Sequence, residues 1–160
     1  MRNGVGQIAS VLLIALAGCG GGGSDAPGAL TGLYEGGEGP RRNQLCMIES
    51  DGRTAFGFAI WGSADANCSA SGMVRRDGEG LSLLPDDDES CALAVTMEGG
   101  RIALPNEIAE DCTLYYCGRG ASMAGAAFDK VGDEETDALR AVDLVGDPLC
   151  RSIDVDVNVK

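Results

Sequence analysis

The chain has 160 residues, with 12 lysines and arginines against 25 aspartates and glutamates, and it contains no histidine. This length predicts one compact domain, because domains usually run to about 100–200 residues. The lack of histidine excludes a Ser-His-Asp or Cys-His catalytic relay and histidine-ligated zinc. A net charge of −13 opposes binding to nucleic acid, because phosphates require a basic face.

The first residues have the pattern of an export signal. Arg2 supplies a positive charge, and an apolar run of ten residues follows, Ile8–Ala17. Such a run is shorter than the roughly 20 residues that cross a membrane, but it fits the apolar region of a signal peptide, about 7–15 residues. We therefore expect export from the cytoplasm.

The apolar run ends in Leu16-Ala17-Gly18-Cys19, which resembles the lipobox of bacterial lipoproteins. The resemblance implies that residues 1–18 are removed as a signal peptide and that Cys19 carries a diacylglyceryl group and an amide-linked acyl chain such as palmitate. The alternative is an ordinary secretory signal with a chance cysteine. Gly20 stands where an aspartate would signal retention in the inner membrane. The resemblance therefore implies a lipid anchor in the outer membrane, with the domain facing the periplasm, and surface exposure stays open.

Residues 19–29 form the expected link between this anchor and the rest of the chain. The segment is rich in glycine, and glycine-rich chains behave as flexible coils. Two or more acyl chains suffice for stable membrane attachment, so no transmembrane helix is needed. The sequence thus predicts a lipidated tether followed by a single globular domain over residues 30–160.

Lipidation of Cys19 leaves six of the seven cysteines, an even number. In an oxidising periplasm, six cysteines predict up to three disulfides with no free thiol. The alternative is a metal or redox site, but the chain has no Cys-x-x-Cys motif and lacks the tight spacing of a zinc site. Taken in chain order, the predicted pairs are Cys46–Cys68, Cys91–Cys112 and Cys117–Cys150.

Short alternating runs separated by turn dipeptides predict a mainly β domain. Asp51-Gly52, Asp77-Gly78 and Gly99-Gly100 are typical hairpin turns. In Arg53–Trp61, one face carries Thr54, Phe56, Phe58 and Ile60, and the other carries Ala55, Gly57, Ala59 and Trp61, so we expect both faces to be buried or tightly approached. About eight strands in a meander predict an antiparallel barrel or sandwich. The expected strands are 31–35, 44–50, 53–61, 67–76, 81–84, 91–97, 102–104 and 113–117, with a further one at 121–128.

The C-terminal part is expected to add one helix and one strand. Asp133 can cap a helix over Glu134–Leu144, with acidic residues in its first turn, and Gly146 and Pro148 follow as stop signals. We expect the helix to pack against a mouth or flank of the sheet. The alternation in Ile153–Val159 predicts a half-buried strand.

No group of residues predicts catalysis, a metal site or a cofactor. The acidic run Asp86–Glu89 could in principle bind calcium, but it lacks the alternating spacing of a calcium loop and is expected to be a solvated turn. Carboxylate pairs can cleave glycosides, yet pairs arise by chance among 25 acids, and seven aromatic residues offer few sugar platforms. We therefore expect a protein that is not an enzyme.

A few polar and aromatic residues have two open interpretations. Tyr115 and Tyr116, placed on opposite faces of a strand, either line a ligand cavity or divide into one core and one surface ring. Trp61 is expected in the core rather than as a binding platform. Arg41-Arg42 and Arg75-Arg76 are expected to form surface ion pairs.

Two short stretches resemble parts of small periplasmic barrels. Gly32–Glu35 is similar to the opening strand of lipocalin-like barrels. Ser69, Ser71 and Gly72, within Ser-Ala-Ser-Gly, resemble the stretch by which membrane-bound inhibitors of c-type lysozyme reach a basic enzyme. These residues are the candidate contacts to a basic protein partner, which the acidic surface would attract.

Two functions follow from these patterns. The first is a lipid-anchored, non-enzymatic binding or structural module, and the alternative is an inhibitor of a basic hydrolase such as c-type lysozyme. A protruding loop at residues 69–72 favours the inhibitor. The same residues buried in a sheet favour the binding or structural module.

Overall fold

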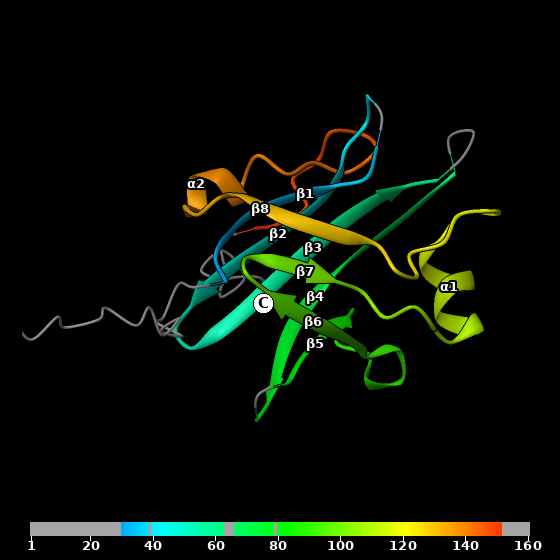
Figure 1. The fold of residues 1–160 in the computed structure, drawn as a ribbon, viewed down its shortest axis with the longest axis horizontal. Helices are drawn as coiled ribbons and strands as arrows, with labels where there is room; N and C mark the ends of the chain where they lie inside the picture. The colour runs from blue at the N-terminus through cyan, green and yellow to red at the C-terminus, as the bar shows by residue number, and fades with distance from the viewer. Residues whose placement is uncertain (1–29, 39, 63–65, 79, 152–160) are drawn as a thin grey trace, which may run out of the picture.

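A computed structural model of the chain describes residues 30–38, 40–62, 66–78 and 80–151. Eight strands pair antiparallel in chain order, and β8 pairs with β1 to close a barrel (Figure 1). Their bounds are β1 Gly32–Gly36, β2 Asn43–Ser50, β3 Arg53–Trp61, β4 Asn67–Asp77, β5 Gly80–Pro85, β6 Leu93–Glu98, β7 Arg101–Ala103 and β8 Ala127–Gly132. The predicted antiparallel fold is confirmed as a barrel. The predicted anchor, tether and last strand lie outside the described residues.

Backbone geometry at two hairpins explains why the chain turns at the predicted dipeptides. Asp51 and Gly52 have φ values of 52° and 73°, and Gly99 and Gly100 have values of 56° and 85°. Two successive residues with positive φ form the type I′ turn, whose twist matches that of paired strands. These turns set the register of β2 on β3 and of β6 on β7.

The barrel interior is packed with apolar side chains. Alternate residues of β3 point inward, and Phe56 and Phe58 stack with ring centroids 6.0 Å apart. Tyr34 donates a hydrogen bond from its hydroxyl to the Leu30 carbonyl over 2.8 Å, and burial raises its pKa to about 12. The other large buried side chains in this core include Leu45, Met47, Leu83, Ile102, Met123 and Phe128.

A second apolar cluster lies on the outside of the barrel. The C-terminal strap, which we define as residues 139–151, carries Ala141, Leu149 and Cys150 into contact with outward side chains of the first three strands. At Gly57 a Cβ atom would overlap the carbonyl oxygen of Leu149, so the strap lies directly on β3. Both faces of β3 are therefore buried, as its small and large alternation predicted.

The disulfides connect Cys46 to Cys150, Cys68 to Cys117, and Cys91 to Cys112. All six cysteines are paired, but only Cys91–Cys112 matches the chain-order prediction, and the other two predicted pairs are wrong. Cys46 belongs to the outer cluster and Cys68 to the inner core. The two side chains therefore face opposite sides of the barrel wall and cannot meet.

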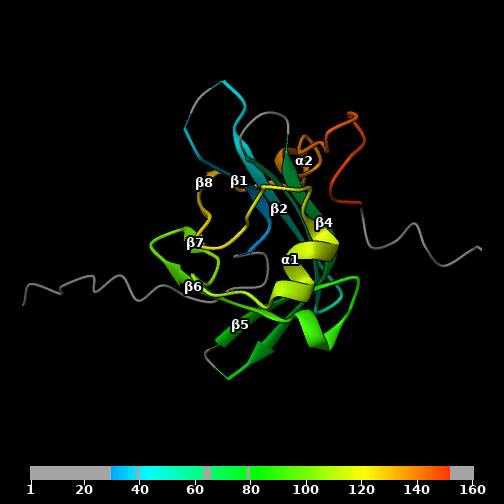
Figure 2. The same cartoon turned by 90° about the vertical axis from the view of Figure 1, so that its right-hand side faces the viewer.

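The segment predicted as a strand at 113–117 is instead a helix, α1, Glu110–Tyr116. Its first turn carries Glu110 and Asp111, whose charges favour the positive end of the helix dipole. Cys112 and Tyr116 are four residues apart and share the face toward the barrel, whereas Tyr115 points outward. The helix lies at one end of the barrel, which faces the viewer in Figure 2.

The predicted C-terminal helix is present but short, since α2 spans Glu135–Ala138. Glu134, not Asp133, is its N-cap, and it forms a capping box with Asp137. The helix packs on β1 and β2, as expected for a helix on a flank of the sheet. After one turn the chain continues as the strap, in which the Leu149 N–H donates to the Ala141 carbonyl and Cys150 is bonded to Cys46.

The predicted strand at 121–128 is also wrong for most of its length. β8 begins only at Ala127. A turn precedes it, in which Gly125 has a φ of 69° and donates its N–H to the Pro105 carbonyl. Such a backbone conformation interrupts an extended strand.

Candidate functional site

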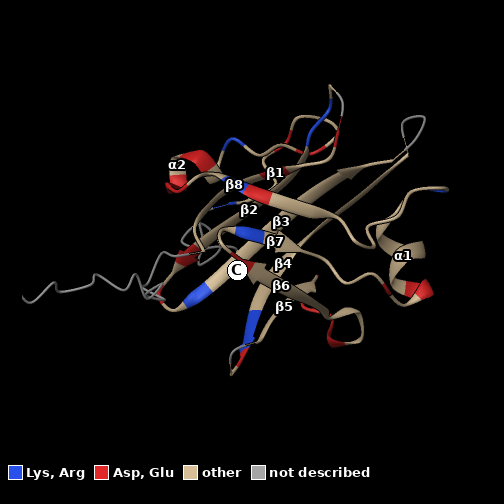
Figure 3. Ribbon diagram, viewed as in Figure 1, with Lys and Arg blue, Asp and Glu red and all other residues tan. Residues whose placement is uncertain are grey.

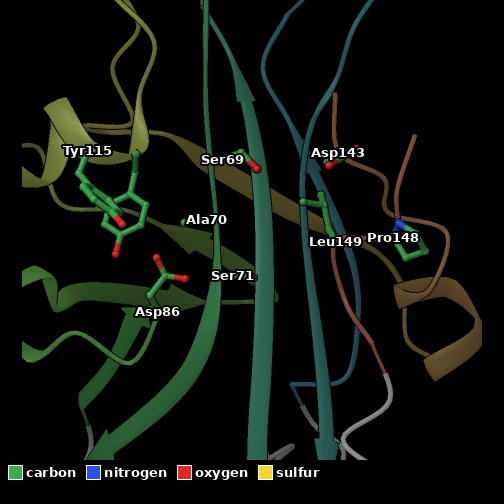
Figure 4. Close-up of a pocket in the computed structure, with 9 residues that line it drawn as sticks. Ser69, Ala70, Ser71, Asp86, Tyr115, Asp143, Pro148 and Leu149 are labelled. Carbon is green, nitrogen blue, oxygen red and sulfur yellow. The ribbon is translucent and has the colours of Figure 1, made fainter. Parts of the chain in front are cut away.

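Three adjoining clefts cross the outer wall of the barrel over β4, and we call them together the β4 groove. The central cleft has a volume of about 360 Å³. It shares Ser71, Pro148 and Leu149 with a second cleft of about 420 Å³, and Asp86, Tyr115 and Tyr116 with a third of about 360 Å³. Figure 4 shows Tyr115 and Asp86 on one side of β4, with Pro148 and Leu149 on the other.

The floor of the groove consists of small outward residues of β4. Ser69 and Ser71 line the central cleft, and Ser71 is exposed, whereas Ala70 between them is buried. Gly72 lines the second cleft, and a Cβ atom there would overlap the Leu84 carbonyl oxygen of β5. The structure thus brings the predicted contact residues Ser69, Ser71 and Gly72 into the groove, within a strand rather than a protruding loop.

Two adjacent tyrosines of α1 form one wall. Their rings meet edge to face, with centroids 4.8 Å apart and an interplanar angle of 74°. The Tyr116 hydroxyl donates to the Pro85 carbonyl over 3.2 Å, which fixes that ring, while Tyr115 is 77% exposed. An exposed aromatic ring held by a fixed neighbour is a ready contact surface. Sequence reasoning missed this pairing because it placed the two rings on opposite faces of a strand.

Carboxylates surround the tyrosines. Asp86, Asp88 and Asp111 line the cleft with them, from the turn after β5 and from the start of α1. Figure 3 shows acidic positions in red on α1. Burial raises the pKa of Tyr116 to about 12, and the negative charges of Asp86 and Asp88 add to the shift. Ser90 donates hydrogen bonds to Asp88 from its hydroxyl and its backbone N–H, which lowers the Asp88 pKa.

The opposite wall of the groove is the C-terminal strap. Asp143, Pro148 and Leu149 line the central cleft. Backbone N–H groups of Asp147 and Val145 donate to the Asp143 carboxylate and hold its pKa below the ordinary value. This carboxylate is therefore ionised at neutral pH.

The two ends of the groove differ in charge. The cleft beside α1 has three carboxylates and no basic residue among its described lining residues. The cleft at the other end is lined by Arg53 and Arg151. A ligand that spans the groove would therefore meet negative charge at the tyrosine end and positive charge at the far end.

The other predicted surface residues lie outside the groove. Arg75 forms ion pairs with Asp77 and Glu89, as expected of a surface arginine. Trp61, predicted in the core, is only half-buried at the end of β3, where the Arg41 guanidinium lies 4.5 Å from the ring centroid. The end of a strand leaves this large ring at the rim of the barrel.

The acidic run at 86–89 forms an exposed turn that leads into a 3-10 helix, η1, Glu89–Cys91. Asp88 caps η1 by accepting from the Ser90 N–H. Among the described residues, no three cysteine, aspartate or glutamate side chains are grouped so that they could hold a metal ion. In the same part of the chain, no helix has the length and apolar character to cross a membrane.

Comparisons with known proteins supply no relative from which a role could be transferred. The chain matches no protein-family model, no curated protein sequence and no solved structure. Any statement about function therefore depends on the chemistry of the groove and on the motifs of the sequence.

Proposed function

We propose that the protein is a lipid-anchored, non-enzymatic binding module of the bacterial cell envelope, which takes a basic protein partner in the β4 groove. One observation carries this proposal: the interior is filled with side chains, whereas the outer wall has an exposed groove with tyrosines and carboxylates. Aromatic side chains are enriched at protein contact surfaces. The net charge of −13 adds long-range attraction for a basic partner.

The charges of the groove fit recognition of a cation, and two of its carboxylates lack the raised pKa of a general acid. A general acid needs a carboxyl group whose pKa is raised toward neutrality. Asp88 and Asp143 have lowered pKa values because they accept hydrogen bonds from neighbouring residues. Both carboxylates are therefore fixed in their anionic form, which attracts a cation but cannot donate a proton.

Site-specific photo-cross-linking in intact cells tests this function. With a photoreactive amino acid at Ser71, we expect a discrete cross-linked product with a basic protein, because Ser71 is exposed on the floor of the groove. The matched control carries the same amino acid at Val131, which is also exposed but lies on β8, four strands away around the barrel. Equal products from both positions, or none from Ser71, would contradict the proposal.

We further propose that Cys19 is the mature N-terminus and carries the acyl chains. The motif Leu16-Ala17-Gly18-Cys19 and the even number of remaining cysteines support this anchor in the outer membrane, facing the periplasm. Mass spectrometry of the mature protein is expected to give an N-terminal peptide that starts at Cys19 and carries the mass of three acyl chains. An N-terminus elsewhere, or an unmodified Cys19, would contradict it.

The inhibitor function is the less favoured candidate. Its motif lies in the middle of β4, and an inhibitor was expected to present these residues on a protruding loop. A separate lysis assay tests this candidate. The purified protein is expected to leave the rate of cell-wall lysis by a c-type lysozyme unchanged. Inhibition that is lost in Ser71→Trp would favour the inhibitor instead.

A further inference from the structure

We propose that the cleft between α1 and the acidic turn is a subsite for one arginine side chain of the partner, with Tyr115 as its stacking surface and Asp86 as its counter-ion. The inference rests on the proposed binding function and specifies the chemistry of the partner. Tyr115, Tyr116 and Asp86 line both the central cleft and the cleft beside α1, so the subsite lies where the two clefts join.

The first step in the inference is the geometry of the aromatic rings. Tyr116 is anchored to the Pro85 carbonyl, and the Tyr115 and Tyr116 rings meet in a T-shaped arrangement. Tyr115 is 77% exposed, and the cation–π contacts found among the described residues involve other rings. By contrast, the Trp61 and Tyr34 rings each have a basic group of this chain nearby, Arg41 and Lys130.

The second step is charge. Asp86, Asp88 and Asp111 line the same cleft, and all three are exposed. Anionic groups around an aromatic face favour a cation over a neutral or acidic group, because the ring quadrupole and the carboxylates attract it together. The raised pKa of Tyr116, caused in part by Asp86 and Asp88, is consistent with this negative potential.

The third step selects arginine among cations. A guanidinium group is planar, stacks on an aromatic face and donates two parallel hydrogen bonds to a carboxylate. Asp86 lies across the cleft from Tyr115 (Figure 4), so a stacked guanidinium can turn its donors toward this carboxylate. A lysine ammonium group gains the charge attraction but not the stacking.

Binding of a defined peptide tests the subsite. The probe is an acetylated and amidated Gly-Ser peptide with two arginines, titrated into the purified full chain in a non-ionic detergent at low salt. We expect Tyr115→Ala to weaken binding about 3- to 10-fold through loss of the cation–π contact. Tyr115→Phe, which keeps the aromatic face, is expected to bind nearly as well as the unchanged protein.

Charge variants complete the test. Asp86→Asn keeps the side-chain shape, and asparagine tolerates the left-handed backbone of this position, where φ is 48°. We expect it to weaken binding about 2- to 5-fold through loss of one exposed ion pair. Glu98→Gln removes the same charge beside the β6–β7 turn, at the end of the barrel opposite α1 (Figure 1), and should leave the affinity unchanged.

Peptide variants identify the recognised group. Citrulline in place of arginine keeps the shape without the charge and should abolish measurable binding, and the lysine peptide should bind at least about 3-fold more weakly. Three outcomes would overturn the arginine subsite. They are equal affinity for the lysine and arginine peptides, measurable binding of the citrulline peptide, and equal effects of Asp86→Asn and Glu98→Gln on affinity. If Ser71 gives no cross-link while the peptide still binds, the proposed protein-binding function is contradicted and the arginine subsite is not. Conversely, cross-links from Ser71 with no effect of Tyr115→Ala would overturn only the subsite.

Discussion

Replacement of both Cys46 and Cys150 by alanine is expected to lower the free energy of unfolding by about 2–5 kcal/mol. This disulfide joins residues 104 positions apart, so it restricts the unfolded chain more than the other two. It also fastens the C-terminal strap to the outer wall, where both cysteines are buried. Urea unfolding, followed by the fluorescence of the only tryptophan, Trp61, measures the change.

The matched control is the double replacement of Cys91 and Cys112 by alanine. Their disulfide closes a shorter loop, with a sequence separation of 21. Loop-closure entropy alone makes its expected loss smaller by about 1 kcal/mol. If both double variants lost the same stability, the long loop and the strap would contribute nothing beyond one ordinary disulfide.

Phe58→Ala is expected to cost about 3–5 kcal/mol, because it deletes a large side chain from the centre of the barrel. Phe58 is 0% exposed, and it stacks on Phe56 within the inner core. A closed barrel wall cannot collapse easily around the missing ring, so a cavity remains. The same urea unfolding measures the loss.

Tyr115→Ala serves as the comparison for Phe58→Ala, since it removes an aromatic ring that is 77% exposed. Surface substitutions of this kind usually change stability by less than about 0.5 kcal/mol. A loss at Tyr115 as large as the loss at Phe58 would show that the α1 tyrosines are structural and would weaken their assignment to a contact surface.

Local patterns predicted most of the barrel. Residues 51–52 and 99–100 adopt the positive φ values that their dipeptides favour, so the hairpins formed where expected. The alternation in β3 predicted both an inner face with large rings and an outer face with small residues. Each of these predictions depends only on residues that are neighbours in the chain.

Features that depend on distant residues were not predictable in this way. Segment 113–117 was expected as a strand, yet Cys112 and Cys117 must reach η1 and β4 respectively, and a helix at the end of the barrel satisfies both. The same limitation applies to the candidate site. Ser71 was identified from its motif, whereas Tyr115 and the strap became part of the site only through contacts across the fold.

The disulfide pattern has a consequence for biogenesis. If the chain enters the periplasm N-terminus first, as the proposed export implies, it exposes Cys46 and Cys68 long before Cys117 and Cys150, their native partners, have crossed. The first bridge accessible to an oxidase is therefore the non-native Cys46–Cys68 pair. Thiolate exchange must then resolve that bridge through a mixed disulfide. Under the proposed periplasmic location, we therefore predict that maturation of this barrel uses a disulfide isomerase as well as an oxidase, and that cells without the isomerase accumulate the chain as a mispaired precursor.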